Sequence, residues 1–144
     1  MKVEQILQAK GTEVFAVRDS ATISDAVSVL NEKNIGAVVV RDDKENIVGI
    51  LSERDVVRRL GKEGSEALSM SVRECMTPDP FTCSPQANVD DLMAQMTEKR
   101  IRHLPVTHSG DIVGVVSIGD VVKRKIAQAE REAAELRSYI ASCP

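Results

Sequence analysis

The chain has 144 residues, and its hydrophobic content of 42% suffices for one compact domain with a core of its own. Its 22 Asp and Glu residues outnumber its 19 Lys and Arg residues, which leaves a net charge of −3, and only 2% of its residues are aromatic. We therefore expect no nucleic-acid partner, because nucleic-acid binding usually requires a basic face and often aromatic stacking platforms.

The start of the chain and its cysteines predict a cytoplasmic protein. Glu4 stands where a signal peptide would begin its apolar stretch. No run of about 18 apolar residues occurs, so no membrane span is expected. Cys75, Cys83 and Cys143 form no CxxC pair and no even disulfide framework, which favours free thiols in a reducing compartment.

The first half of the chain predicts alternating helices and strands. Ile23, Val27 and Leu30 recur on one helical face behind Thr22 or Ser24, either of which is a suitable N-cap. A continuous β-branched run follows, which is typical of a buried strand. The expected elements are a helix at 3–7, a strand at 14–17, a helix at 22–33, strands at 35–40 and 47–51, a helix beginning at 53–60 and a polar linker at 61–71.

The second half predicts the same order of elements. The expected elements are a short helix at 72–76, a helix marked by Val89, Leu92, Met93 and Met96, strands at 101–106 and 112–116, and a last helix from Ser117 or Ile118 to about Tyr139. In the last helix, residues 123–137 mix charges of both signs with alanines. This composition indicates a helix that is solvated or packs on a partner.

The two halves of the chain match each other in sequence. Ile35 corresponds to Ile101, and beyond one extra residue near Lys44, Gly49 corresponds to Gly114. A repeat of this length does not bury its apolar face alone. We therefore predict a mixed α/β (α+β) protein built from a pseudo-symmetric pair of β-α-β-β-α units. The predicted domains are residues 1–70, with the N-terminal segment, first repeat and linker, residues 71–126, with the second repeat, and residues 127–144, a C-terminal helical extension.

Both repeats carry the motif Gly-x-x-Ser-x-x-Asp where a strand meets the following helix. The motif ends in Ser52 and Asp55 in the first repeat, and in Ser117 and Asp120 in the second. A helix N-terminus attracts phosphate, and an ionised Asp can accept both hydrogens of a ribose diol. The alternative is an ordinary helix cap, in which Ser and Asp bond to each other's backbone. The doubled occurrence favours a functional role.

Arg102 and His103 are further candidates for an anion site. Both side chains can donate hydrogen bonds to phosphate. The alternatives are a solvated sheet edge for Arg102 and a hydrogen-bonded core position for His103. The first repeat has Gly36 and Ala37 at the corresponding positions, so the two sites are predicted to be unequal.

The order and doubled spacing of these motifs resemble a tandem pair of CBS domains, also called a Bateman module. The resemblance extends over roughly residues 1–126 and rests on the two Gly-x-x-Ser-x-x-Asp runs, Met76-Thr77-Pro78 and residues 99–106. It implies a non-catalytic regulatory module with no catalytic cofactor. The implied ligand contains adenosine (AMP, ADP, ATP, NAD(H) or S-adenosylmethionine). Because the sequence shows no effector domain, we expect either an effector protein in trans or a reservoir role for the module.

The resemblance also assigns roles to individual residues. The aspartates are expected to hold ribose, the serines and the Arg102–His103 pair to contact phosphate, two threonines to line the cleft, and four residues to lie beside adenine. The expected site residues are Thr12, Ala16, Ile35, Gly36, Ala37, Ser52, Arg54, Asp55, Thr77, Thr82, Ile101, Arg102, His103, Ser117, Gly119 and Asp120. Arg54 stands where the second repeat has Gly119, so it either restores a phosphate contact or is a surface charge.

Two other classes of function remain open. An enzyme is one, although the chain has no glycine-rich phosphate loop and no nucleophile elbow. His103 and His108 have no Cys or carboxylate cluster to complete a metal site, and Cys75 and Cys83 have no base beside them in sequence. The other is a structural dimerisation module with empty clefts.

Self-association is expected from a surplus of apolar helix faces. The apolar residues on these faces are Ile23, Val27, Leu30, Val56, Val57, Val89, Met93, Met96, Val121 and Val122. They are more than one small core needs, and twofold dimers are the commonest oligomers. We predict a disc-like homodimer, and the alanine-rich last helix can extend its contact.

Overall fold

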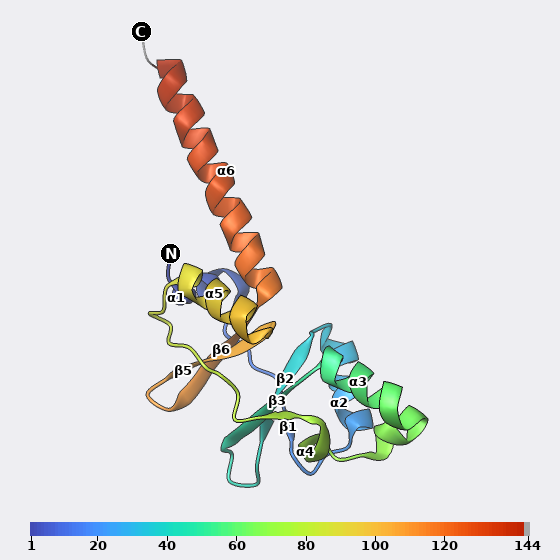
Figure 1. Ribbon diagram of the computed structural model, residues 1–144. Helices are drawn as coiled ribbons and strands as arrows, with labels where there is room; N and C mark the ends of the chain where they lie inside the picture. The colour runs from blue at the N-terminus through green and yellow to red at the C-terminus, as the bar shows by residue number, and fades with distance from the viewer. Residues whose placement is uncertain (143–144) are drawn as a thin grey trace.

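The two repeats form two lobes, and one long helix projects from the second lobe (Figure 1). The structure, a computed structural model, describes residues 1–142, so the predicted thiol of Cys143 and the end of the predicted C-terminal extension lie outside the described residues. In chain order the elements are α1 (Val3–Lys10), β1 (Ala16–Arg18), α2 (Ile23–Lys33), β2 (Ala37–Arg41), β3 (Ile47–Ser52), α3 (Glu53–Glu63), the 3-10 helix η1 (Gly64–Ser69), α4 (Val72–Cys75), β4 (Thr77–Pro78), α5 (Val89–Lys99), β5 (His103–His108), β6 (Asp111–Ser117) and α6 (Ile118–Ser142).

The first lobe contains a four-stranded mixed sheet in the order β1-β2-β3-β4. The strand β1 is parallel to β2, whereas β2 and β3 form an antiparallel hairpin and β4 pairs antiparallel with β3. Helix α2 begins after Thr22, whose Oγ1 accepts a 3.2 Å hydrogen bond from the backbone N–H of Asp25. Thr22 rather than Ser24 is therefore the N-cap. The predicted linker is partly helical, because η1 follows α3 and buries Ala67.

The second lobe repeats this order with a reduced first strand. Strands β5 and β6 form an antiparallel hairpin. At the expected position of the first strand, Cys83 makes only a single parallel bridge, to Val106. Pro80 and Pro85 flank this segment, and proline has no N–H to donate to a sheet ladder. The predicted mixed α+β fold is thus confirmed, with one strand of the second unit shortened to a bridge.

Two predicted strands begin two residues later than expected. Asn34 and Arg100 adopt the left-handed conformation, with φ of 53° and 56°. Beyond Asn34, the N–H of Ile35 donates to the carbonyl of Leu30 at 3.0 Å, and Ile101 makes the corresponding bond in the second repeat. These bonds close the C-terminal ends of α2 and α5. Ile35 and Ile101 therefore finish a helix instead of opening a strand.

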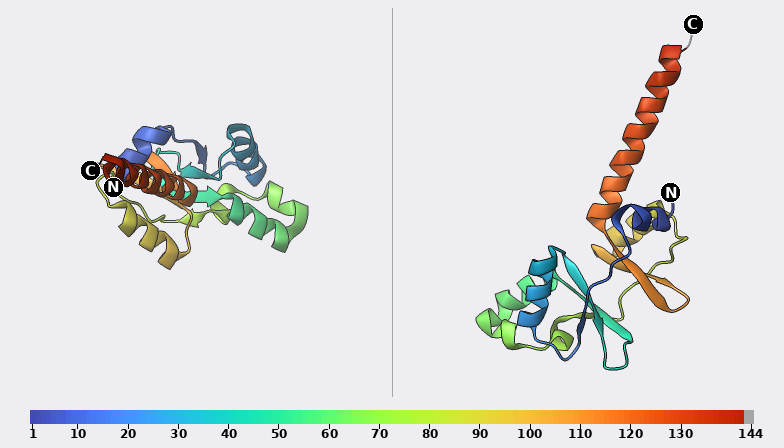
Figure 2. Two further views of the ribbon diagram at one scale, coloured as in Figure 1. Left: turned by 90° about the horizontal axis from the view of Figure 1, so that it is seen from above. Right: turned by 180° about the vertical axis from the view of Figure 1, so that it is seen from behind.

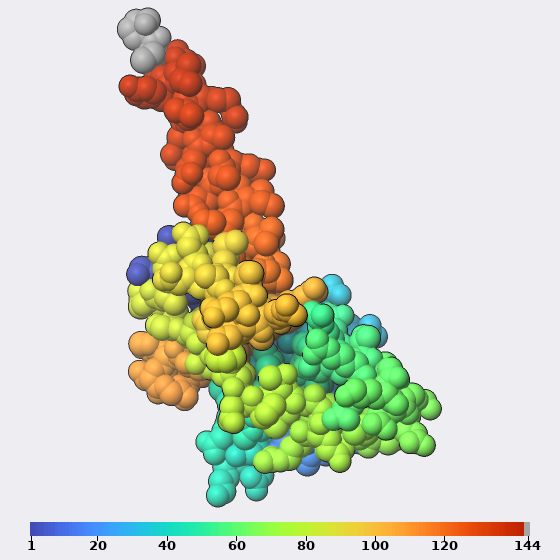
Figure 3. Space-filling model, in the orientation of Figure 1, coloured from blue at the N-terminus to red at the C-terminus, as the bar shows by residue number. Residues whose placement is uncertain are grey.

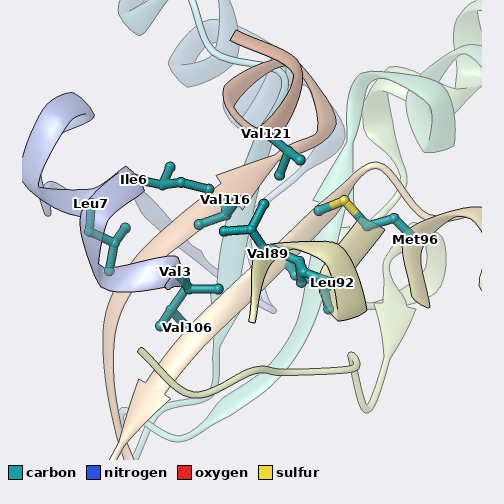
Figure 4. Packing of buried hydrophobic residues seen from close by; sticks show 10 residues of the cluster. Val3, Ile6, Leu7, Val89, Leu92, Met96, Val106, Val116 and Val121 are labelled. Carbon is teal, nitrogen blue, oxygen red and sulfur yellow. The ribbon is translucent and has the colours of Figure 1, made fainter. Parts of the chain in front are cut away.

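Each lobe is completed by a short helix that precedes the other repeat in sequence. Ile6 and Leu7 of α1 are buried in the core of the second lobe, against residues such as Val89 (Figure 4). Correspondingly, Val72 and Cys75 of α4 are buried in the core of the first lobe. The packing therefore groups α1 with the second lobe, whereas the predicted domain limits follow the order of the chain.

Two corresponding glycines permit this exchange of helices. A Cβ atom on Gly49 would lie 2.5 Å from Sδ of Met76 and 2.8 Å from the carbonyl oxygen of Thr77. A Cβ atom on Gly114 would lie 2.6 Å from Cδ2 of Leu7. Any side chain at these positions would push the exchanged segment off the sheet, so the motif glycine has a packing role in both repeats.

Helix α6 extends far beyond the second lobe. Val121 is buried in the core, and the first turns of α6 contact α1, α5 and β6. All residues from 129 to 142 are exposed, and this part of the helix projects away from both lobes in Figure 1 and in the right view of Figure 2. Neither α6 nor any other helix within residues 1–142 has the length and apolar character that would let it cross a membrane.

Candidate functional site

Two clefts lie where the lobes meet. The first cleft has a volume of about 460 Å³ and opens between the start of α3, the strand β4 and the chain before β5. Its lining residues are Gly36, Ile50, Ser52, Glu53, Arg54, Asp55, Arg58, Thr77, Lys99, Arg100, Ile101, Arg102 and His103. The second cleft has a volume of about 350 Å³ and is lined by Lys10, Gly11, Glu13, Phe15, Asn34, Ile35, Gly36, Ala37, His103, Val115, Ser117 and Asp120.

In the first cleft, Ser52 and Asp55 form a reciprocal cap at the start of α3. The backbone N–H of Ser52 donates to Oδ2 of Asp55 at 2.9 Å, and Oγ of Ser52 donates to the same oxygen at 3.1 Å. The backbone N–H of Asp55 donates in return to Oγ of Ser52 at 3.3 Å. The cap expected as the alternative to ligand binding is therefore present. It uses one carboxylate oxygen, and within residues 1–142 no hydrogen bond reaches Oδ1 of Asp55.

The first cleft is strongly cationic. Five of its lining side chains carry a positive charge, and two carry a negative charge. The cations are Arg54, Arg58, Lys99, Arg100 and Arg102, and the anions are Glu53 and Asp55. They come from α3 of one repeat and from the α5–β5 junction of the other. A concave surface with this balance of charge attracts polyanions, and phosphate groups in particular.

In the second cleft, Asp120 is already paired with a cation from the N-terminal helix. Nζ of Lys10 lies 2.7 Å from Oδ2 of Asp120 and 2.8 Å from the carbonyl oxygen of Val115. Ser117 caps α6 as Ser52 caps α3, since Oγ of Ser117 accepts a 3.1 Å hydrogen bond from the backbone N–H of Asp120. In return, the N–H of Ser117 donates to Oδ2 of Asp120 at 2.9 Å. Partial burial raises the pKa of Asp120, but the hydrogen bonds from Lys10 and Ser117 outweigh it and hold that pKa below its ordinary value.

His103 stands between the clefts and lines both of them. Burial lowers the pKa of His103 below its ordinary value, and the charge of Lys10 lowers it further, so the imidazole is neutral at neutral pH. Gly36 faces it closely: a Cβ atom at Gly36 would lie 3.0 Å from Nε2 of His103 and 2.9 Å from Oε1 of Glu53. The small residue at position 36 thus leaves room for the histidine in the wall between the clefts.

The structure brings most of the predicted site residues to one cleft or the other. The first cleft contains Gly36, Ser52, Arg54, Asp55, Thr77, Ile101, Arg102 and His103. The second contains Ile35, Gly36, Ala37, His103, Ser117 and Asp120. Thr12 lines a separate shallow cavity beside Leu7 and His108, and Ala16, Thr82 and Gly119 line neither cleft. The assignment of these residues to ligand binding stays a prediction.

Sequence reasoning missed several charged residues of the clefts. Arg58 lies one helical turn after Arg54, so the periodicity of α3 could have pointed to it. Lys99 and Arg100 directly precede residues that were predicted, and they join the first cleft because α5 ends there. Lys10 had no local signal, because it reaches Asp120 from a helix at the other end of the chain.

The two cysteines within residues 1–142, Cys75 and Cys83, show no activation as nucleophiles. Cys75 is buried, and burial raises its pKa above the ordinary value. Burial raises the pKa of Cys83 to about 11. Both thiols are therefore protonated at neutral pH, and a protonated thiol is a poor nucleophile. This weakens the cysteine-based version of an enzymatic function.

Known proteins of similar sequence and structure carry the same repeated unit. The family model described as the CBS domain matches residues 3–62 and residues 72–126. The chain is 35% identical over 136 residues to the mitochondrial CBS domain-containing protein CBSX3 of Arabidopsis thaliana, covering 92% of this chain and 66% of that protein. A crystal structure of a CBS-domain containing protein from Agrobacterium tumefaciens is 39% identical, with a TM-score of 0.84 and coverage of 86% and 92%.

A second solved structure shares the fold at lower identity. It is a CBS domain protein from Pyrobaculum aerophilum, 24% identical, with a TM-score of 0.74 and coverage of 83% of this chain and 89% of that one. The two segments that match the family model correspond to the two repeats of the structure. The exchanged core helices and the two clefts lie where these repeats meet. The chain belongs to the CBS domain family and contains two copies of the domain.

Proposed function

We propose that this protein is a non-catalytic regulatory module that binds adenosine-containing nucleotides in its two clefts and signals by changing conformation. One observation carries the proposal: in the first cleft a carboxylate at a helix N-terminus stands beside five cationic side chains. A carboxylate suits a ribose diol, and the helix N-terminus and cations suit phosphates. A nucleotide carries both groups.

Ligands of similar proteins support adenosine as the common part of the ligand. The Pyrobaculum aerophilum protein was solved in complex with AMP. The CBS domain pair of protein MJ0100, 22% identical to this chain, was solved in complex with 5'-methylthioadenosine and S-adenosyl-L-methionine. These ligands share adenosine and differ in what is attached to it. We therefore use the charge of each cleft to infer which of these ligands it prefers.

In the first cleft, Asp55 would hold the ribose through its free oxygen. Ser52 and Thr77 would lie near the phosphates, together with the cations of α3 and of the α5–β5 junction. Ile50 and Ile101 would supply the aliphatic surface for adenine, since no Phe, Tyr or Trp is among the described residues that line this cleft. Five cations against two anions favour a ligand with several phosphates, so we propose ATP and ADP ahead of AMP or NAD here.

The second cleft is proposed to bind more weakly and to favour a less charged ligand. Lys10 already bonds Oδ2 of Asp120, so a ribose diol would have to use Oδ1 alone or compete with the ammonium for Oδ2. Lys10 is the one side chain of this lining that is charged positively at neutral pH, and Glu13 adds a negative charge. Phosphate groups would meet little positive charge in the second cleft, so they would add little to the affinity there. The two clefts are therefore proposed to differ in affinity, as expected from the unequal pairs Gly36-Ala37 and Arg102-His103.

Self-association and an effector protein complete the proposed regulatory role. Val57 of α3 is 65% exposed, and Leu60 is exposed on the same helix. An apolar face of this kind suits a second copy of the chain in a disc-like homodimer. The signal would then pass to another protein in trans.

The expected compartment is the cytoplasm, which fractionation of the source cells would test.

Calorimetric titration with AMP, ADP, ATP, NAD and S-adenosylmethionine tests the proposal. Asp55→Asn keeps an oxygen for the cap of α3 but removes the charged acceptor, so it should weaken ATP binding by about tenfold to a hundredfold. Asp25→Asn is the matched control, because Asp25 forms the same cap on α2 outside both clefts. If no adenosine ligand binds, or if neither Asp55→Asn nor Asp120→Asn changes the affinity, the protein is better explained as a structural dimerisation module.

A further inference from the structure

We propose that residues 122–140 of α6 pair with the same helix of a second copy of this chain as a parallel two-stranded coiled coil. The inference builds on the self-association proposed above, but it assigns a different surface and fixes the orientation of the two copies. It does not depend on ligand binding in the clefts.

The first observation is a heptad pattern on α6. Its apolar residues recur at intervals of four, three, four, three and four: Val122, Ile126, Ala129, Ala133, Leu136 and Ile140. Alternation of four and three residues is the spacing of core positions in a left-handed coiled coil. With Ile126 at position a, the core positions a are 126, 133 and 140, and the positions d are 122, 129 and 136.

The second observation is that these six apolar residues, the apolar seam of α6, are not covered by other described residues of the chain. Ile126, Leu136 and Ile140 are 54%, 60% and 63% exposed. At about 100° per residue, the seam lies roughly a quarter turn around the helix from Val121, which packs into the second lobe. It therefore runs unobstructed from the lobe to the far end of α6, where the helix stands clear of the body (Figure 3). A solitary helix of this kind gains most of its stability from packing on a partner.

The charges beside the seam select a parallel copy of the same helix. In a parallel pair, a residue at position g faces position e of the next heptad on the partner helix. Glu132 then faces the partner's Arg137, and Lys125 faces the partner's Glu130; both contacts join opposite charges. The second is weaker, because Lys125 already lies 2.8 Å from Asp90 of its own lobe.

An antiparallel pair with the same core layers would bring like charges together. Glu130 would face the partner's Glu130, Glu132 would face the partner's Glu132, and Lys123 would face the partner's Arg137. Within residues 1–142, neither Glu132 nor Arg137 forms an ion pair in its own chain, so both are available to a partner. The parallel arrangement puts the second lobes of the two copies side by side, with each coil starting two residues after Asp120.

Disulfide cross-linking of the full chain tests the pairing. Each cysteine is introduced together with Cys143→Ser, so that the native thiol near the end of the chain does not contribute to the cross-linking that is compared. Leu136→Cys lies at a core position and should form an intermolecular disulfide readily under mild oxidation. Ala134→Cys, two residues away on the outer face, is the matched control and should cross-link much more slowly. Equal rates for both variants, or no cross-link at Leu136→Cys, would overturn the proposal.

A mixing experiment tests the orientation. In an antiparallel pair, position 126 meets position 136, so chains with Ile126→Cys would cross-link to chains with Leu136→Cys. In the parallel pair, each of these variants cross-links to itself instead. Preferential formation of the mixed disulfide would overturn the parallel arrangement. Light scattering on the unmodified protein separates the two inferences: a dimer without the cross-link at 136 leaves the disc-like dimer standing, whereas a monomer rejects both.

Charge reversal tests the selectivity. Glu132→Lys should weaken the pairing of α6 by roughly twofold to tenfold, because two exposed ion pairs become repulsive in the symmetric coil. The double variant Glu132→Lys with Arg137→Glu should restore it. The readout is the rate of the Leu136→Cys cross-link in each background. No change with Glu132→Lys, or no recovery in the double variant, would contradict the charge argument.

Discussion

Lys10 at the end of α1 and Asp120 at the start of α6 lie 110 positions apart in sequence, yet Nζ of Lys10 is 2.7 Å from Oδ2 of Asp120. Their ion pair joins the first helix of the chain to the last. It also occupies the carboxylate that corresponds to Asp55 of the first cleft. Within residues 1–142 both aspartates keep Oδ1 free of hydrogen bonds, but Asp120 alone carries a lysine on its Oδ2, so the two clefts differ in the charge beside the carboxylate.

Lys10→Met should open the second cleft. Removing the ammonium leaves Asp120 with its bonds from Ser117 alone, so the affinity of this cleft for a neutral ribose ligand such as adenosine should rise. The cost in stability should be small, about 0.2–1 kcal/mol, because the pair is partly exposed. Titration calorimetry and urea unfolding measure the two effects.

Lys125→Met is the matched control for that experiment. It breaks a comparable Lys–Asp contact, to Asp90, at 2.8 Å but outside both clefts. It should leave adenosine binding unchanged. An equal gain in affinity from both variants would show that loss of positive charge in general, and not release of Asp120, is responsible.

His103 should make the stability of the fold depend on pH. Its pKa in the folded protein lies below the unfolded value of 6.5, mainly because of burial. Below pH 6.5 the unfolded chain therefore binds more protons at this residue than the folded chain does. Stability contributed by the neutral imidazole is complete above pH 6.5 and is lost as the pH falls toward the folded pKa.

The pH effect can be assigned to His103 by substitution. His103→Gln should flatten the decline in the free energy of unfolding between about pH 6.5 and pH 5, the range in which histidine titrates. His108→Gln is the control, since His108 is exposed on β5. Urea unfolding at a series of pH values is the measurement. An unchanged slope in His103→Gln would mean that other groups cause the decline.

Arg58→Gln should weaken ATP binding in the first cleft more than AMP binding. Arg58 adds charge to the cleft from the second turn of α3, and a charge-assisted contact to phosphate is worth roughly 1.5–3 kcal/mol. The expected loss for ATP is about tenfold or more, with a smaller loss for AMP. Arg131→Gln, on the exposed part of α6, should change neither affinity. Equal losses for ATP and AMP would place Arg58 away from the distal phosphates.

The motif glycines should tolerate alanine poorly, and to different degrees. Gly49→Ala would press on the backbone oxygen of Thr77, which cannot yield easily, whereas Gly114→Ala would press on the side-chain end of Leu7. We expect destabilisation by about 1–3 kcal/mol, larger for Gly49→Ala. Gly61→Ala in α3 meets no atom within 4 Å and should stabilise the helix by up to about 1 kcal/mol. Thermal unfolding gives the order, and a reversed order would contradict the packing account.

Local features of the fold were predictable because their causes are local. Thr22 and Ser52 cap helices through bonds to residues three positions ahead, so the pattern of residue types already contains them. The same holds for the hairpins and for the repeat. Ile35 and Ile101 were misplaced at the start of strands, because the left-handed turn of the preceding residue is not visible in a run of apolar residues.

The sequence by itself determined the doubled β-α-β-β-α unit, the capped starts of α3 and α6 and the heptad spacing of α6, since each depends on contacts or periods of a few residues. The tertiary structure alone decided that α1 packs on the second repeat, that Lys10 meets Asp120 and that the cations of α5 and α3 share one cleft. These contacts depend on how two separately folded units dock. The docking surface is formed by residues far apart in the chain, and no short stretch of sequence contains it.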